Sequence, residues 1–268
     1  MHRKRLATPR ASLTLGEQTG SGLDQPPGDV EEGTVHAIVV IPARYDSSRL
    51  PGKVLAPLSG RPMIQHVWER ASRSSVQRVL VATDDLRVAE VVRGFGGEVV
   101  MTAETHPSGS DRVYEAIQGQ PCEIVVNVQG DEPLLDPALV DRLVQALEQD
   151  HQLDVATPAA PLHGDPDRPS VVKVVADTAG RALYFSRAAI PHGGPWLHHL
   201  GVYAFRRDAL ERYVGLPRGP LEQGERLEQL RLLEHGLRIG VVLVEQAQPS
   251  VDTPEDLTLV RSLLASHP

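Results

Sequence analysis

The sequence predicts an α/β fold in which an open, mostly parallel sheet carries helices on both faces, together with a small β-hairpin insertion. Short continuous apolar runs alternate with amphipathic helical patterns through the first half of the chain, which is typical of parallel strands buried on both faces. After residue 150 the alternation changes, and two apolar runs joined by a turn indicate the hairpin. We expect one domain over residues 34–268, with the insertion at 170–206.

The first 33 residues differ from the rest of the chain in composition. Residues 1–33 are rich in Gly, Pro, Ser, Thr and Gln and show no apolar periodicity. Such a segment buries too little apolar surface to offset its ordering entropy, so we expect a disordered N-terminal extension. It is either a tail or the product of a start codon assigned too early.

The elements expected in the first half follow the alternation of apolar runs and helical patterns. Strands are expected at 35–41, 79–81, 98–101 and 124–128, and helices at 62–73, 86–94, from 111 and from 137. Gly94, Gly96 and Gly97 end the second helix, and Pro137 suits the first turn of the last one.

The second half begins with the hairpin and returns to helices and strands. The hairpin strands are expected at 171–176 and 181–185, joined by the turn at 177–180. We expect this hairpin to leave the main sheet as an arm on the substrate side or the dimer side. Further strands are expected at 200–205 and 237–244, and helices at 221–235 and 254–264.

Charge and cysteine content exclude several classes of protein. The chain of 268 residues has a formal net charge of −8, whereas nucleic acids and anionic membranes attract positive surfaces. The single cysteine, Cys122, excludes an internal disulfide framework and a cysteine-rich metal site. Without a signal-peptide pattern or an apolar run of transmembrane length, we expect a cytoplasmic protein.

A loop with three cations follows the first expected strand. Arg44, Arg49 and Lys53 fall within ten residues, in a loop that also contains two prolines and a glycine. Each cation alone would be a solvated surface charge, but together they favour polyphosphate and hence a nucleoside triphosphate site. A P-loop kinase is disfavoured, because Ser47 and Val54 stand where that motif needs Gly and Ser or Thr.

Two aspartates are candidate metal ligands. Asp131 lies at the carboxyl end of a buried run, where it could hold Mg²⁺ beside substrate phosphates. The alternative for Asp131 is a cap of the helix near Pro137, and the metal role is favoured. Asp252 precedes Thr253 and Pro254 in a helix-start pattern, so the residues alone favour a cap there.

The segment Ser108–Arg112 also resembles a helix start. Ser108 or Ser110 would cap it, with free amides available to an oxygen-rich ligand. Arg112 pairs either with an acidic substrate or with Glu115. The two histidines at 198 and 199 have no further metal ligand at suitable spacing, so the residues alone assign them no role.

These segments closely resemble one known family, the 3-deoxy-manno-octulosonate cytidylyltransferases, or CMP-Kdo synthetases. The likeness runs in order through nearly all of the chain after residue 35, in segments 40–53, 81–85, 108–112, 126–133, 172–175, 182–187, 199–203, 227–231 and 251–257. It implies a Rossmann-like nucleotidyltransferase that moves CMP from CTP to the anomeric hydroxyl of the acidic sugar 3-deoxy-D-manno-octulosonate (Kdo). It further implies release of pyrophosphate, use of Mg²⁺, a homodimer, and activation of the sugar for lipopolysaccharide synthesis.

The resemblance also implies a role for individual residues. The nucleotide side comprises Arg44, Ser47, Arg49, Lys53 and Ser108. The implied catalytic residues are Arg49, Lys53, Gln129 and Asp131. The sugar side comprises Arg112, Gln129, Arg187, His199, Glu228 and Gln229. Asp131 and Asp252 are implied as the metal ligands, which reverses the preference for a cap at Asp252.

Some alternatives remain open within this resemblance. Segment 191–198 is shorter than in most family members, so a lid or dimer contact made by it stays undecided. The sugar could also be an 8-amino analogue of Kdo or a sialic acid. A non-catalytic nucleotide-binding protein is disfavoured because Lys53, Asp131 and Asp252 are intact. A glycosyltransferase is disfavoured because no expected strand is followed directly by an Asp-x-Asp pair and because the loop after the first strand is rich in Arg and Lys.

Overall fold

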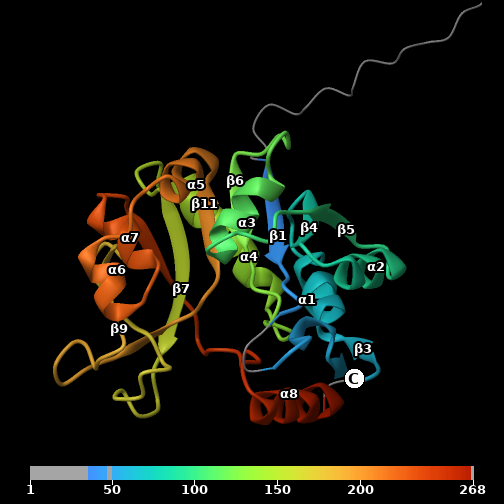
Figure 1. The fold of residues 1–268 in the computed structure, drawn as a ribbon. Coiled ribbons are helices and arrows are strands. Elements are labelled where there is room, and N and C mark those ends of the chain that lie inside the picture. The colour runs from blue at the N-terminus through green and yellow to red at the C-terminus, as the bar shows by residue number, and fades with distance from the viewer. Residues whose placement is uncertain (1–35, 47–49, 267–268) are drawn as a thin grey trace, which may run out of the picture. The chain divides into compact units, whose positions relative to one another are not determined.

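A single ten-stranded sheet forms the centre of the protein (Figure 1). The computed structural model describes residues 36–46 and 50–266, so the expected extension at 1–33 lies outside the described residues. The strand order is β5-β4-β1-β6-β11-β7-β10-β8-β9, with β12 paired to β7. The first four strands are mutually parallel and the rest form a mixed sheet, which confirms the predicted open α/β fold.

The bounds of the elements agree with most of the expected ranges. The strands are β1 (Ala37–Pro42), β2 (Pro57–Leu58), β3 (Arg61–Pro62), β4 (Arg78–Thr83), β5 (Glu98–Met101), β6 (Ile124–Asn127), β7 (Val155–Pro161), β8 (Lys173–Ala176), β9 (Ala182–Ser186), β10 (Leu197–His199), β11 (Tyr203–Arg206) and β12 (Ile239–Leu243). The helices are α1 (Met63–Ala71), α2 (Leu86–Gly94), α3 (Gly109–Ala116), α4 (Pro137–Gln149), α5 (Arg207–Val214), α6 (Pro220–Glu225), α7 (Gln229–Glu234) and α8 (Pro254–Ser266), with a 3-10 turn η1 at Lys53–Leu55.

Helices cover both faces of the sheet, as predicted. The alternating side chains of β1 divide between two apolar cores, with Val39 and Ile41 in one and Ile38 and Val40 in the other. The first core is completed by α1, α2 and α4, and the second by α3, α5 and α7. Every residue of β1 is buried, which explains why its sequence is continuously apolar rather than alternating.

A third, smaller core holds the last helix. Leu58 and Met63 pack with Val251, Leu257 and Val260, so α8 lies against β2 and the start of α1. This packing brings the segment before α8 to the same end of the sheet as the loop after β1. Within the described residues no helix is long and apolar enough to cross a membrane.

The hairpin was correctly predicted, but its expected departure from the sheet is wrong. Strand β8 pairs antiparallel with β9 and also with β10, which in turn pairs with β7. The hairpin therefore extends the sheet to its edge. Apolar side chains at Val174, Ala182 and Phe185 are buried in the second core, which is why the hairpin stays on the main body.

Candidate active site

The loops after β1 and β6 meet in one cavity at the carboxyl ends of these strands, where open α/β sheets bind ligands. The cavity has a volume of about 320 Å³. The polar side chains that line it belong to Arg44, Asp46, Lys53, Gln129, Asp131 and Asp252. The structure therefore brings together residues that stand up to 208 positions apart, as was predicted for the cationic loop and Asp131.

Lys53 lies between the two aspartates. Its ammonium Nζ is 2.5 Å from Oδ2 of Asp131 and 3.2 Å from Oδ1 of Asp252, and only 12% of the lysine side chain is exposed. Burial lowers the pKa of Lys53, but the charges and hydrogen bonds of Asp131 and Asp252 outweigh it, so the pKa is raised overall. The Lys53 side chain therefore remains protonated and positively charged in this cavity.

The backbone around Asp131 fixes the position of its carboxylate. The neighbouring Gly130 lies against β1, and a Cβ there would be 3.1 Å from the Pro42 carbonyl oxygen and 3.3 Å from Val54 Cγ1. On the other side, the amide of Val251 donates to the Asp131 carbonyl at 2.9 Å. Helix α4 is capped by Asp136, whose side chain accepts from the amide of Ala138, so the alternative role of Asp131 as that cap is excluded.

The cap of α8 is the residue after Asp252. Thr253 Oγ1 accepts from the amide of Asp256, and Asp256 Oδ2 accepts from the amides of Asp252 and Thr253. This is a capping box in which threonine is the cap. The cap interpretation therefore applies to Thr253, and the Asp252 carboxylate is turned toward Lys53.

The carboxylate oxygens of the two aspartates are suitable ligands for Mg²⁺. Because both carboxylates approach the same ammonium, their oxygens converge on one point, and Mg²⁺ is usually held by one or two carboxylates together with substrate phosphates and water. Among the described residues there is no cluster of three or more His, Cys, Asp or Glu side chains suited to a metal. A cation here would depend on phosphate oxygens for its remaining ligands.

A second cavity, of about 300 Å³, adjoins the first. Gly109 and Gln129 line both cavities, so they mark the boundary between them. The Gln129 amide donates to the side-chain oxygen of Asn127 at 3.0 Å, which orients it at the end of β6. Glu228 and Gln229 line the second cavity, as was expected for the sugar side, and burial raises the pKa of Glu228.

A buried ion pair holds the wall that carries Glu228 and Gln229. The predicted helix at 221–235 is two helices, α6 and α7, separated by Arg226, which has a left-handed backbone with φ of 56°. Arg231 of α7 donates two hydrogen bonds of 2.6 Å to Glu222 of α6, and both side chains are buried. The break between the helices points residues 226–229 toward the cavity.

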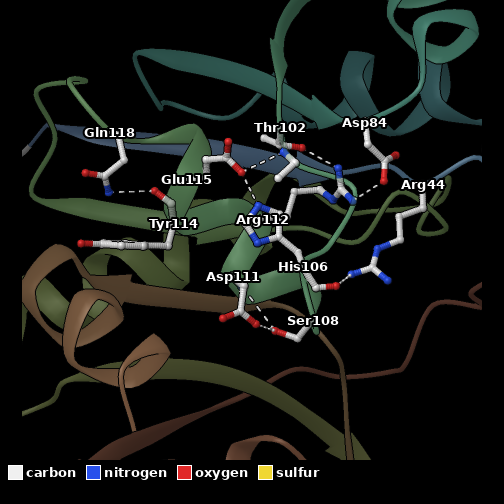
Figure 2. A network of polar contacts seen from close by, with 11 residues as sticks. Arg44, Asp84, Thr102, His106, Ser108, Asp111, Arg112, Tyr114, Glu115 and Gln118 are labelled. Atoms are coloured by element: carbon white, nitrogen blue, oxygen red, sulfur yellow. Dashed lines mark hydrogen bonds and ion pairs between the residues drawn. The ribbon is translucent and has the colours of Figure 1, made fainter.

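Helix α3 begins at the edge of the first cavity. Ser108 caps the helix by accepting from the amide of Asp111, which decides between the two predicted serines. The Arg44 guanidinium donates to the carbonyl of His106 at 2.7 Å, and the His106 ring is hydrogen-bonded to Glu115 of α3. Arg44 is therefore tied to the loop before α3, as Figure 2 shows.

The structure does not bring Arg112 to the sugar side. Its side chain is fully buried, pairs with Asp84 at 2.6 Å and donates to Thr102 at 2.5 Å (Figure 2). The predicted surface pair with Glu115 is absent from these contacts, because Glu115 instead binds His106 and the amide of Ala103. Arg112 thus joins the ends of β4 and β5 to α3, and its implied role as a sugar ligand stays a prediction.

Arg187 and His199 also lie outside the lining of the second cavity. The Arg187 guanidinium donates to the carbonyls of Pro169, Glu225 and Arg226, and so ties the hairpin to α6. The His199 ring packs between Phe185 and Tyr203 and is hydrogen-bonded to Thr157. Burial lowers the pKa of His199 to about 3. Both residues support the wall of the cavity, and their implied role as sugar ligands stays a prediction.

Sequence reasoning missed several residues of the second cavity. Tyr203, Tyr213 and Arg226 line it in addition to the predicted pair. Tyr203 belongs to the family-like segment 199–203 and could have been found there, whereas Tyr213 and Arg226 carry no local signal. The remaining predicted residues, Ser47 and Arg49, lie outside the described residues.

An α/β sheet of this kind, with a lysine and two carboxylates at its carboxyl edge and an adjoining polar cavity, defines a nucleotidyltransferase. The cytidylyltransferase family model matches residues 38–239. A 3-deoxy-manno-octulosonate cytidylyltransferase of Bradyrhizobium sp. (strain ORS 278) is 50% identical over 239 residues, covering 85% of this chain and 97% of that protein. That of Rhodopseudomonas palustris (strain HaA2) is 49% identical over the same length, with the same coverage. The chain belongs to the 3-deoxy-manno-octulosonate cytidylyltransferase family.

One solved structure agrees with this membership, and a second shares the fold alone. A CMP:2-keto-3-deoxy-manno-octonic acid synthetase complexed with CTP superposes with a TM-score of 0.85 at 46% identity, covering 87% of this chain and all of that one. A cytidylyltransferase from Leptospira borgpetersenii shares the fold with a TM-score of 0.62 at 18% identity.

Proposed function

We propose that this chain transfers CMP from CTP to the anomeric hydroxyl of Kdo, giving CMP-Kdo and pyrophosphate, and so activates the sugar for lipopolysaccharide synthesis. The observation that carries the proposal is the pair of adjoining cavities that share Gln129. One contains cations and carboxylates suited to a triphosphate, and the other is lined by hydroxyl, amide and carboxyl groups suited to a sugar. Gln129 stands at the boundary, where the two substrates would meet.

The reaction requires positioning and charge neutralisation more than a protein nucleophile. The anomeric oxygen would attack the α-phosphorus, forming a new P–O bond while the bond to pyrophosphate breaks. Lys53 and Arg44 would offset the negative charge of the triphosphate, and Lys53 is best placed to do so because it is the more buried of the two. Gln129 would orient the sugar oxygen or the α-phosphate by hydrogen bonding.

We also propose Mg²⁺ as the cofactor, held by Asp131 and Asp252. When bound, Mg²⁺ would offset charge that builds on the phosphate oxygens and the pyrophosphate leaving group. From the family resemblance we also propose that the chain forms a homodimer. We further propose that it works in the cytoplasm and, given its net charge, binds neither nucleic acid nor membrane. Light scattering coupled to gel filtration measures the molar mass and so tests for the homodimer.

Pyrophosphate release with CTP and Kdo tests the proposed reaction. We expect turnover by the wild-type protein and by the control Arg93→Met, which removes an exposed charge. The Lys53→Ala protein should show almost none. The same assay with 8-amino-Kdo and a sialic acid identifies the preferred sugar. Release with Kdo no faster than in the Lys53→Ala protein would overturn the proposal, and a faster rate with another acidic sugar would change only the acceptor.

A further inference from the structure

We infer that Lys53 competes with the divalent cation for the two aspartates, so that the site binds the cation tightly only when a triphosphate draws the lysine ammonium away. This inference rests on the proposed Mg²⁺ role of Asp131 and Asp252. It assigns Lys53 a second task besides contacting phosphate. The lysine acts as a positioning residue that keeps the carboxylates paired and couples cation binding to nucleotide binding.

The geometry places the ammonium on the oxygens that would bind the cation. Nζ of Lys53 lies 2.5 Å from an Asp131 oxygen and 3.2 Å from an Asp252 oxygen. A Mg²⁺ ion contacts its oxygen ligands at roughly 2.0–2.1 Å. A cation held by the same two oxygens would have to compete with Nζ for them. Two cations on one pair of oxygens would also repel each other.

The backbones of the two aspartates are held in place, while the lysine carries its ammonium on a flexible stem. The Asp131 backbone is clamped between the close packing of Gly130 and the hydrogen bond from Val251, and the Asp252 segment is held by the Thr253 capping box. Lys53, in contrast, carries its charge on a four-carbon stem with several rotatable bonds. The ammonium can swing toward phosphate oxygens without any change in the backbone of η1.

A triphosphate supplies the force for that movement. Arg44 and Lys53 line the same cavity as the two aspartates, so phosphate oxygens held there come within reach of the ammonium. Once the ammonium pairs with phosphate, the aspartate oxygens can bind the cation, and the phosphates add further oxygen ligands. Binding of each ligand then favours binding of the other by the same factor.

A static ion pair leads to a different expectation. If Lys53 only stabilised the fold, or if the cation bound elsewhere, removal of the lysine would leave cation affinity unchanged or reduce it. Competition instead means that loss of the lysine increases cation affinity in the absence of nucleotide. Tighter cation binding by an inactive Lys53 variant therefore distinguishes competition from a static ion pair.

The test measures binding of Mn²⁺ alone by electron paramagnetic resonance of the unbound ion, in a buffer without nucleotide. The proteins are the wild type, Lys53→Met, Lys53→Gln and the charge-matched control Arg93→Met, which removes one exposed cation from α2. We expect both Lys53 variants to bind Mn²⁺ about tenfold more tightly than the wild type, a factor that corresponds to about 1.4 kcal/mol. Arg93→Met should match the wild type.

A double variant shows whether the additional Mn²⁺ binds at the two aspartates. Asp252→Asn combined with Lys53→Met should lose the additional Mn²⁺ affinity, because one of the two contested oxygens is gone. In EDTA the Lys53→Met protein should melt below the wild type, since two carboxylates are left facing each other, and Mn²⁺ should raise its melting temperature more than that of the wild type. Circular dichroism of each variant checks that it is folded.

Equal or weaker Mn²⁺ binding by both Lys53 variants, relative to the wild type, would overturn the competition. That outcome leaves CMP transfer intact, since turnover is measured separately. Absence of Mn²⁺ binding in every protein, with CTP present or absent, would remove the proposed metal site and this inference together. Wild-type protein that binds Mn²⁺ as expected but does not turn over CTP and Kdo would contradict only the proposed reaction.

Discussion

At the scale of single residues, Asp131 shows how a common residue type acquires a specific role. Aspartate after a buried strand is usually a turn or cap residue. Here the cap of the following helix is Asp136, and the Asp131 side chain contacts Lys53 instead. The Asp131 side chain is 25% exposed and is not the cap of the following helix, so its carboxylate is available to a cation, and through it to the charge that develops during phosphoryl-type transfer.

We expect Asp131→Asn to lose far more activity than nucleotide affinity. The substitution keeps the shape but removes the negative charge, and a loss of about 10²-fold or more in kcat is typical when a group acts on charge in the transition state. Measured by calorimetry without divalent cation, the Kd for CTP should change by less than about threefold, because ground-state contacts from Arg44 and Lys53 remain. Parallel losses in kcat and in affinity would assign Asp131 to ground-state binding instead.

Residue types alone predicted that Lys53 and Asp131 face one crevice, which the structure confirms, but they were insufficient at other positions. For Asp252 the residues alone favoured a cap, and the family resemblance was needed to reverse this. Arg112 carries the same charge as Arg44, yet it is buried against Asp84. Nothing within the segment Ser108–Arg112 distinguishes a ligand arginine from a structural one, because the partner Asp84 comes from a different strand end.

At the scale of elements, the loop between β5 and α3 shows how a helix can hold a cation in place. One carboxylate oxygen of Glu115 binds the Ala103 amide at 3.0 Å and also the His106 ring, so both ends of the loop are attached to α3. The His106 carbonyl between these anchors binds Arg44. The helix thereby orients a side chain of the loop after β1.

Loosening this anchor should weaken nucleotide binding. We expect His106→Ala and Glu115→Gln to raise the KM for CTP about three- to tenfold, because Arg44 loses a rigid partner, with kcat changed by less than about twofold. Gln118→Ala is the control, since the exposed Gln118 side chain follows α3 and donates to the Tyr114 carbonyl of that helix. A fall in kcat without a change in KM for CTP would contradict this role for the loop.

The elements that the sequence did not predict have identifiable reasons. Strand β7 has prolines at 158 and 161 and several alanines, a composition that disfavours strand prediction, yet it pairs with β10, β11 and β12. Helix α5 starts directly after β11 without a side-chain cap, so no start signal precedes it. The break between α6 and α7 carries no glycine that would signal it. The left-handed residue there is Arg226.

At the scale of the whole molecule, the stability of the sheet depends on keeping one histidine neutral. His199 is fully enclosed at the junction of β7, β10 and β11, and burial lowers its pKa to about 3, while an unfolded histidine titrates near about 6.5. Above pH 6.5 both states are neutral and the histidine adds no pH dependence. As the pH falls below 6.5 the unfolded state takes up a proton that the folded state does not, so the fold is progressively destabilised.

This linkage should be visible in equilibrium unfolding by urea. Between pH 7.5 and pH 5 the wild type should lose about 2 kcal/mol more unfolding free energy than His199→Gln, as expected for a histidine kept neutral in the fold. The variant will be less stable at both pH values, because it disturbs the contact with Thr157, so the compared quantity is the difference between the two pH values. His198, whose pKa burial also lowers, is present in both proteins and cancels. The same loss in both proteins would mean that His199 is protonated in the folded sheet.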